Sequence, residues 1–128
     1  MNFPLPEKPK LILVLGRICG PDGDVAVRLA LDTGATYSVI DSEILALAGY
    51  DPVACGDRVR ISTASGIEFC PRVVLSKFEC LDRQVLDFPV LGHALPEGTA
   101  VDGLLGLDFL HGTRLTLDFK SGILSLTL

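Results

Sequence analysis

The residues of this chain best suited to chemistry stand together in one loop, Asp32-Thr33-Gly34-Ala35. The preceding segment, 25–31, alternates apolar residues with small or polar ones, which is typical of a half-buried strand. An apolar pair, Val39-Ile40, follows shortly after the loop. The sequence therefore places a carboxylate at the end of a strand, between two apolar segments. Because burying an unpaired carboxylate is costly, this placement indicates that Asp32 has a function.

Two neighbouring carboxylates can hydrolyse a peptide bond. The ionised one takes a proton from the attacking water, and the protonated one donates to the carbonyl oxygen. Within hydrogen-bond reach the two share one proton and titrate as a pair, which predicts activity at acidic to near-neutral pH. In such a loop the Gly34 N–H can reach the carboxylate, Thr33 can bond to a facing loop, and Ala35 leaves room for substrate.

The second carboxylate of such a pair has no obvious source within the chain. Asp-Thr-Gly occurs once, and Asp22-Gly23 and Asp102-Gly103 lack both the intervening hydroxyl residue and the preceding strand. A second Asp32 must then come from another copy of the chain, related by a two-fold axis. The sequence therefore predicts a homodimer as a condition of activity.

The elements that must position Asp32 are short strands. An apolar run at 11–15 predicts a first strand buried on both faces, and a turn at 21–24 leads into the strand at 25–31. A helix is predicted over 41–49, capped by Asp41 or Ser42 and ended by Gly49. Further strands and a second short helix are predicted at 58–63, 67–70, 73–78, 84–91, 107–111 (the helix), 114–119 and 123–128. This pattern predicts an all-β barrel or folded sheet with one or two short helices.

Taken together, these features resemble the retropepsin-like aspartic proteases, the single-domain, retroviral-type branch of the aspartic proteases. The resemblance runs from about Leu11 to Leu128. It rests on Asp32-Thr33-Gly34-Ala35 with Ser38 beyond it, on a hairpin at Arg58–Arg72, and on Leu104-Leu105-Gly106 followed by a short helix.

The resemblance implies a fold and a set of roles. It implies a closed barrel or folded sheet with one Asp-Thr-Gly lobe per chain, and Asp32 as the catalytic residue. Thr33, Gly34 and Ala35 would complete the active-site loop. The hairpin would be a flap that covers a peptide or protein substrate, with its tip at Ala64, Ser65 and Gly66. The segment Leu104, Leu105 and Gly106 would brace the loop from behind.

The domain organisation is simple. Residues 1–10 are predicted to be an extended N-terminal tail, because three prolines within 1–9 disfavour both helix and sheet pairing. Residues 11–128 are long enough for one domain with a core built mostly of Leu, Val, Ile and Ala. The apolar last strand, 123–128, is expected to pair with something else.

Charge and composition limit the partners and the compartment. A net charge of −5 with scattered Lys and Arg argues against nucleic acid or an anionic membrane as partner. No signal-peptide core or run of transmembrane length is present, so the chain is expected to be soluble and cytoplasmic, although relatives of this kind can carry a membrane anchor before the domain.

Neither a metal nor an organic cofactor is predicted. Cys19, Cys55, Cys70 and Cys80 form no C-x-x-C pair, and their spacing does not suggest a zinc site, so free thiols in a reducing compartment are expected. His93 and His111 are interpreted as single histidines without catalytic or metal-binding neighbours. Asp102 and Asp108 are interpreted as turn and helix-end residues.

Alternatives remain at this stage. Asp-Thr-Gly is also a common turn sequence. A dimeric module that holds a peptide without cutting it, or a dimerisation domain of a larger assembly, fits the same fold. The leading hypothesis is an aspartic endopeptidase that uses one Asp32 from each subunit.

Overall fold

The computed structural model describes residues 2–5, 11–95 and 100–128. The elements, in chain order, are β1 (Asn2–Pro4), β2 (Leu13–Gly20), β3 (Gly23–Leu31), β4 (Val39–Asp41), α1 (Ser42–Leu47), β5 (Arg58–Thr63), β6 (Gly66–Cys80), β7 (Arg83–His93), β8 (Gly103–Leu105), α2 (Leu107–Leu110), β9 (Arg114–Asp118) and β10 (Ile123–Thr127).

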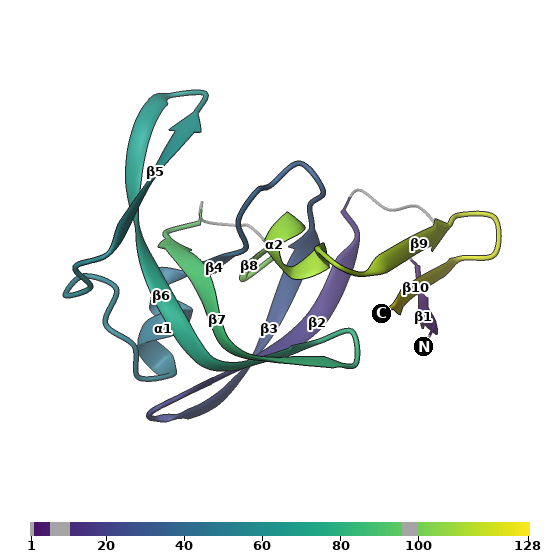
Figure 1. The fold of residues 1–128 in the computed structure, drawn as a ribbon, viewed down its shortest axis with the longest axis horizontal. Coiled ribbons are helices and arrows are strands. Elements are labelled where there is room, and N and C mark those ends of the chain that lie inside the picture. Colours follow the sequence, from purple (N-terminus) through teal and green to yellow (C-terminus); the bar gives the residue numbers. More distant parts are fainter. Residues whose placement is uncertain (1, 6–10, 96–99) are drawn as a thin grey trace.

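Six strands close into a barrel, so the prediction of an all-β barrel with short helices is confirmed (Figure 1). The strand order is β2-β3-β8-β4-β7-β6, and pairing of β2 with β6 closes the ring. Strand β5 pairs with the first part of β6, beyond the barrel, and the two form a hairpin that projects from the body. A separate sheet, β1-β10-β9, lies at the other end of the molecule.

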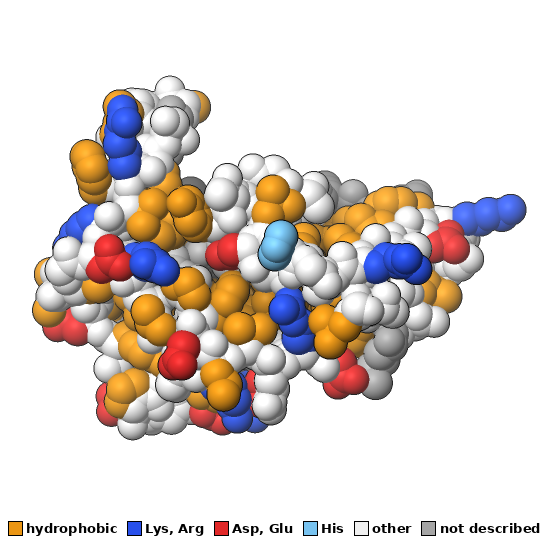
Figure 2. Space-filling model, viewed as in Figure 1, with side chains coloured by type: hydrophobic (Ala, Val, Ile, Leu, Met, Phe, Trp, Pro, Cys, Tyr) orange, Lys and Arg blue, Asp and Glu red, His pale blue; other side chains and the backbone are white. Residues whose placement is uncertain are grey.

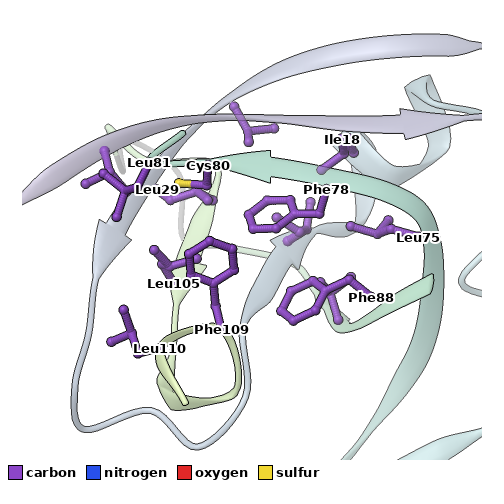
Figure 3. Packing of buried hydrophobic residues seen from close by; sticks show 14 of the residues in the cluster. Ile18, Leu29, Leu75, Phe78, Cys80, Leu81, Phe88, Leu105, Phe109 and Leu110 are labelled. Carbon is purple, nitrogen blue, oxygen red and sulfur yellow. The ribbon is translucent and has the colours of Figure 1, made fainter. Parts of the chain in front are cut away.

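The barrel is filled by side chains from most of its strands and from α2. Most of the buried residues are aliphatic, as predicted, but three phenylalanines lie among them (Figure 3). The rings of Phe78 and Phe88 stack with centroids 5.1 Å apart, and Phe109 of α2 meets both rings edge-on. Offset and edge-to-face pairs of this kind add to the free energy gained from burial alone. Helix α2 is thereby anchored to β6 and β7.

The first strand differs from its prediction. Strand β2 begins at Leu13 and continues to Gly20, and the side chain of Leu15 is 75% exposed whereas Val14 is buried. The expectation of burial on both faces was therefore wrong. In a closed barrel successive side chains point alternately inward and outward, so only one face of β2 can contribute to the interior.

The N-terminal residues also differ from their prediction. Asn2–Pro4 pair with β10, with Phe3 opposite Leu124, so the expectation that prolines exclude this segment from a sheet was wrong for β1. The pairing is tolerated because β1 is an edge strand and Pro4 is its last residue, a position where no N–H is needed for the ladder. Residues 6–10 of the predicted tail, and 96–99 of a predicted loop, lie outside the described residues.

The helix ends and the C-terminal strand follow local sequence signals. The Asp41 side chain accepts a hydrogen bond from Glu43 N, and Gly49 follows α1 with a φ of +96°, which suits glycine. Leu124 and Leu126 of β10 are buried, and the strand pairs with β1 and β9, so the expected pairing is confirmed.

Within the described residues, no helix is long and apolar enough to cross a membrane.

Candidate active site

The short strand β8 determines where Asp32 lies. It inserts between β3 and β4, parallel to β3 (Leu31 opposite Leu105) and antiparallel to β4 (Val39 opposite Leu104). The chain leaves β3, crosses over the end of β8 and returns as β4. The crossing segment, residues 32–38, is called the Asp32 loop below. Because β8 is far from β3 and β4 along the chain, no local sequence pattern predicts that it lies between them.

Backbone hydrogen bonds fasten this loop to β8 and α2. The Asp32 N–H donates to Leu105 O at 2.9 Å, and the Leu107 N–H donates to Ala35 O at 2.8 Å. The Gly34 N–H donates to Asp32 Oδ1 at 2.9 Å, as the sequence predicted. A Cβ at Gly34 would lie only 3.2 Å from that oxygen. The structure therefore brings Leu104, Leu105 and Gly106 directly behind the Asp32 loop.

A buried polar network, which the sequence analysis missed, holds the far end of the loop. Ser38 is 1% exposed, and its Oγ donates to Asp108 Oδ1 at 2.7 Å and accepts from the Gly106 N–H at 3.0 Å. The Ser38 N–H donates to Asp108 Oδ2 at 2.9 Å. Asp108 is therefore more than a helix-end residue, because it ties α2 to the loop. The only signal in the sequence was a serine directly before the apolar pair Val39-Ile40.

Gly106 is required by the same packing. A Cβ at this position would lie 2.7 Å from Ala35 O and 2.9 Å from Tyr37 O, distances at which the backbone would have to move. Because the glycine lacks a side chain, the loop can approach β8 closely enough for the Ser38 bond to form.

Asp32 opens onto a cleft of about 530 Å³ between the loop and the β5–β6 hairpin. Among its lining residues are the apolar Val39, Ile61, Leu91 and Leu104, together with Arg60 and Ser62 of β5. A larger hollow of about 830 Å³ runs along β2 and the β6–β7 turn and contains no residue of the Asp32 loop. The cleft beside Asp32 is therefore the relevant one, because it combines a carboxylate with apolar walls.

The predicted flap tip is not part of this cleft in the single chain. Ala64 and Ser65 connect β5 to β6, and Gly66 has a φ of +126° that suits glycine. None of the three lines the cleft; the lining residues of the hairpin are Arg60, Ile61 and Ser62. Thr33 is exposed at the surface of the loop. The hairpin itself is where the sequence predicted it, whereas the substrate-binding role of its tip stays a prediction.

The other residues singled out from the sequence are the four cysteines and the two histidines. All four cysteines are free, and burial raises the pKa of the Cys80 thiol to about 12. His111 ends α2 and is followed by Gly112 with a φ of +80°. His93, in contrast, has neighbours that the sequence analysis did not foresee: Glu68 and Cys70 lie beside it.

Fold and site together define the class of this protein: a barrel with one strand-to-loop aspartate per chain and a projecting hairpin, as in the retropepsin-like aspartic proteases. A family model described as "Aspartyl protease" matches residues 14–109. The chain belongs to this family of aspartyl proteases, and its fold is of the retropepsin-like type.

A solved structure shares the fold. The retropepsin-like aspartic protease from Rickettsia conorii superposes with a TM-score of 0.71 at 15% sequence identity, covering 99% of this chain and 91% of that one. At this identity the match is evidence for the fold alone. No curated protein matches the chain.

Proposed function

We propose that this chain is an aspartic endopeptidase that acts as a homodimer and hydrolyses peptide bonds in extended polypeptides. The observation that carries the proposal is Asp32 at the mouth of an apolar cleft, with one carboxylate oxygen held by the Gly34 N–H. Within the described residues, Asp32 Oδ2 accepts no hydrogen bond and remains available for a water or a second carboxylate. Membership of the aspartyl protease family supports the same chemistry.

The homodimer follows from the count of catalytic groups. Each chain supplies one Asp-Thr-Gly loop, and the reaction needs an ionised and a protonated carboxyl group side by side. A two-fold axis at the Asp32 loop would bring Asp32 and Asp32 of the partner subunit together. Thr33 is exposed on the same loop, and in the proposed dimer it would bond across this axis.

In the proposed reaction, water adds to the scissile carbonyl carbon and loses a proton to the ionised Asp32. The protonated Asp32 of the partner subunit donates its proton to the carbonyl oxygen, which gives a neutral tetrahedral diol. The C–N bond then breaks, and the leaving nitrogen takes up a proton while a diol hydroxyl returns one. The carboxyl pair ends with the single shared proton it began with.

Substrate binding would use the cleft and the hairpin. An extended peptide would lie as a strand between the Asp32 loop and the β5–β6 hairpin, which acts as the flap. Ile61, Leu91 and Leu104 line the cleft, so we expect apolar side chains next to the cleaved bond. The loop and its brace, Leu104–Gly106, would keep Asp32 fixed while the flap moves.

The test is cleavage of an unstructured protein, read by mass spectrometry from mildly acidic to neutral pH, at a concentration where the chain is shown to be dimeric. We expect Asp32→Asn to lower the rate by at least about 100-fold, since acid–base catalysis is lost. Asp24→Asn is the matched control, because Asp24 is exposed and, within the described part of the chain, its one ion-pair contact, to Arg17, is 4.0 Å long. No cleavage by the dimeric wild-type chain would contradict the proposal and favour a peptide-binding module.

A mixing experiment tests the shared site separately. When Asp32→Asn is equilibrated with an equal amount of wild type, about half of the wild-type subunits enter mixed dimers with one carboxylate. We therefore expect the activity to fall to about half of that of the same concentration of wild type alone. An unchanged activity in a mixture whose subunits demonstrably exchange would show that each chain works alone.

A further inference from the structure

Three metal-ligating side chains meet where the β5–β6 hairpin joins the barrel. Glu68 and Cys70 are two residues apart on β6, so their side chains lie on the same face of the strand. Strands β6 and β7 are antiparallel, and Arg72 of β6 lies opposite Leu91 of β7. His93, the last residue of β7, therefore lies beside Cys70. The carboxylate, thiol and imidazole donor atoms all lie within 4.8 Å of one another.

Both ring nitrogens of His93 lie close to oxygen atoms. Its Nδ1 lies 2.7 Å from Ala94 O, and its Nε2 lies 2.9 Å from Glu68 Oε2. Both partners are oxygen acceptors, whereas a neutral imidazole carries a single N–H. When that N–H donates to Ala94 O, the Nε2 lone pair points toward Glu68 and is available to bind a metal ion. Histidine ligands of metals are usually oriented in this way, with the second nitrogen bonded to a carbonyl or carboxylate.

We propose that Glu68, Cys70 and His93 bind a divalent zinc ion at the base of the hairpin. One imidazole, one thiolate and one carboxylate are ordinary zinc ligands, and three protein ligands leave a fourth position for water. Tetrahedral donors around zinc lie about 3.3–3.8 Å apart. The 2.9 Å between Nε2 and Oε2 would have to widen slightly, and the donor pairs that now approach 4.8 Å would have to close.

The electrostatics of the cluster fit a divalent cation. A thiolate and a carboxylate together carry the two negative charges that neutralise Zn²⁺. Burial and the Glu68 carboxylate raise the pKa of the Cys70 thiol, while the nearby Arg58 guanidinium lowers it. Zinc would displace the thiol proton on binding. The imidazole side chain is 41% exposed and the Glu68 side chain 43%, so the ion can reach the site from solvent.

The position of the site suggests what zinc would do. Glu68 and Cys70 lie in the part of β6 that pairs with β5, whereas His93 belongs to the barrel. A bound ion would therefore tie the hairpin to the barrel and restrict its movement. This consequence rests on the proposed protease function, in which the hairpin must open and close; the binding of zinc does not.

Binding is tested with Co²⁺ as a spectroscopic substitute for zinc, using the reduced full chain. We expect one Co²⁺ per chain, a near-ultraviolet thiolate-to-cobalt absorption band, and loss of the band when Zn²⁺ is added. Cys70→Ser should abolish the band. His93→Gln should weaken the affinity for Co²⁺ by at least about 100-fold, because losing a metal ligand costs more affinity than losing a group that orients one. Cys55→Ser is the matched control, since Cys55 is a free, half-buried thiol outside the cluster.

Two results would overturn the site: absence of the band in the wild-type chain, or a band of full strength in Cys70→Ser. Either would mean that Cys70 forms no thiolate bond to a metal at this place. If Cys70→Ser fails to fold because Cys70 is buried, His93→Gln decides, since the half-exposed histidine can be replaced without disturbing the core. An affinity in His93→Gln equal to wild type would then refute the proposal.

A second arm separates the metal from the protease. If zinc slows peptide cleavage by the wild-type chain but not by His93→Gln, the restriction of the hairpin is supported. If zinc slows both equally, the effect lies elsewhere and the restriction is refuted. If the wild-type chain binds Co²⁺ with the expected band but cleaves nothing, the zinc site stands and the proposed protease function fails.

Discussion

The Asp32 loop and the β5–β6 hairpin face each other across the same cleft but are built in opposite ways. The loop is backed by Leu105 and Phe109, both 0% exposed, and by the buried bonds of Ser38. Among the described residues, β5 forms strand pairs with β6 alone, and Ile67 and Phe69 of the hairpin are 54% and 65% exposed. Figure 2 shows hydrophobic and basic side chains together on the projecting hairpin.

This difference matches two different requirements. In the proposed dimer, a carboxylate that meets its symmetry mate has to be held in one position, which calls for dense packing and satisfied buried hydrogen bonds. A segment that admits and releases a peptide must open at low cost, which calls for few buried contacts. Substitutions on the two sides of the cleft should therefore have very different effects on stability.

The largest difference is expected between two phenylalanines. Phe109→Ala empties a fully buried site next to Phe78 and Phe88 and should lower the free energy of unfolding by about 3–5 kcal/mol. Phe69→Ala on the exposed hairpin should change it by no more than about 0.5 kcal/mol. Urea unfolding of both variants measures the contrast. Similar losses in the two would mean that the hairpin is packed as firmly as the loop.

Two glycines give the next contrast. Gly106→Ala pushes a Cβ against Ala35 O and the Tyr37 backbone and should cost about 3 kcal/mol, with loss of any proteolytic activity because the Asp32 loop is displaced. Gly56, just before β5, has open space around it and no left-handed φ. Gly56→Ala should therefore be neutral or stabilising by up to about 1 kcal/mol. Thermal unfolding distinguishes the two, and a tolerated Gly106→Ala would contradict the close approach.

The polar network of the loop predicts a smaller but specific effect. Ser38→Ala leaves the Gly106 N–H without its partner, removes one of the hydrogen bonds that Asp108 Oδ1 accepts, and should cost about 2 kcal/mol. Ser62→Ala on β5 should leave stability unchanged, because Ser62 is exposed. In a double-mutant cycle, Ser38→Ala and Asp108→Ala should be clearly non-additive. Strict additivity would show that the two residues act independently.

The last prediction concerns the interior of the barrel at alkaline pH, where stability changes only gradually with each pH unit. Burial raises the pKa of the Cys80 thiol from 9.0 to about 12. Above pH 9 the unfolded chain loses this proton while the folded chain keeps it. The stability contributed by the neutral thiol is thus complete below pH 9 and is lost as the pH rises toward 12.

Unfolding free energies measured from pH 9 upward test this assignment. The slope against pH should be shallower in Cys80→Ala than in wild type by about 1.4 kcal/mol per pH unit. Val90→Ala, a variant that enlarges the interior without removing a thiol, should keep the wild-type slope. An equal slope in Cys80→Ala would show that water reaches this part of the barrel.

Much of the fold was predictable because its signals are local. Alternation located β3, β5 and β9, the Asp41 and Gly49 caps bounded α1, and a short turn marked the hairpin at Ala64-Ser65. The positions of the site residues were predictable too, since Asp32, Gly34 and the Leu104–Gly106 segment lie together. Their roles in catalysis stay a prediction. What failed was the assignment of roles to single polar residues, Asp108 and His93, whose partners lie 70 and 25 residues away along the chain.

The sequence by itself determined the period of the strands, the helix caps, and the presence of one strand-end aspartate per chain. Each depends on residues within a few positions of one another. Only the tertiary structure decided that β8 inserts between β3 and β4, that β1 pairs with β10, and that Glu68, Cys70 and His93 converge. These depend on which strands become neighbours when the barrel closes, and that choice minimises the exposed apolar surface of the whole chain rather than of any one segment.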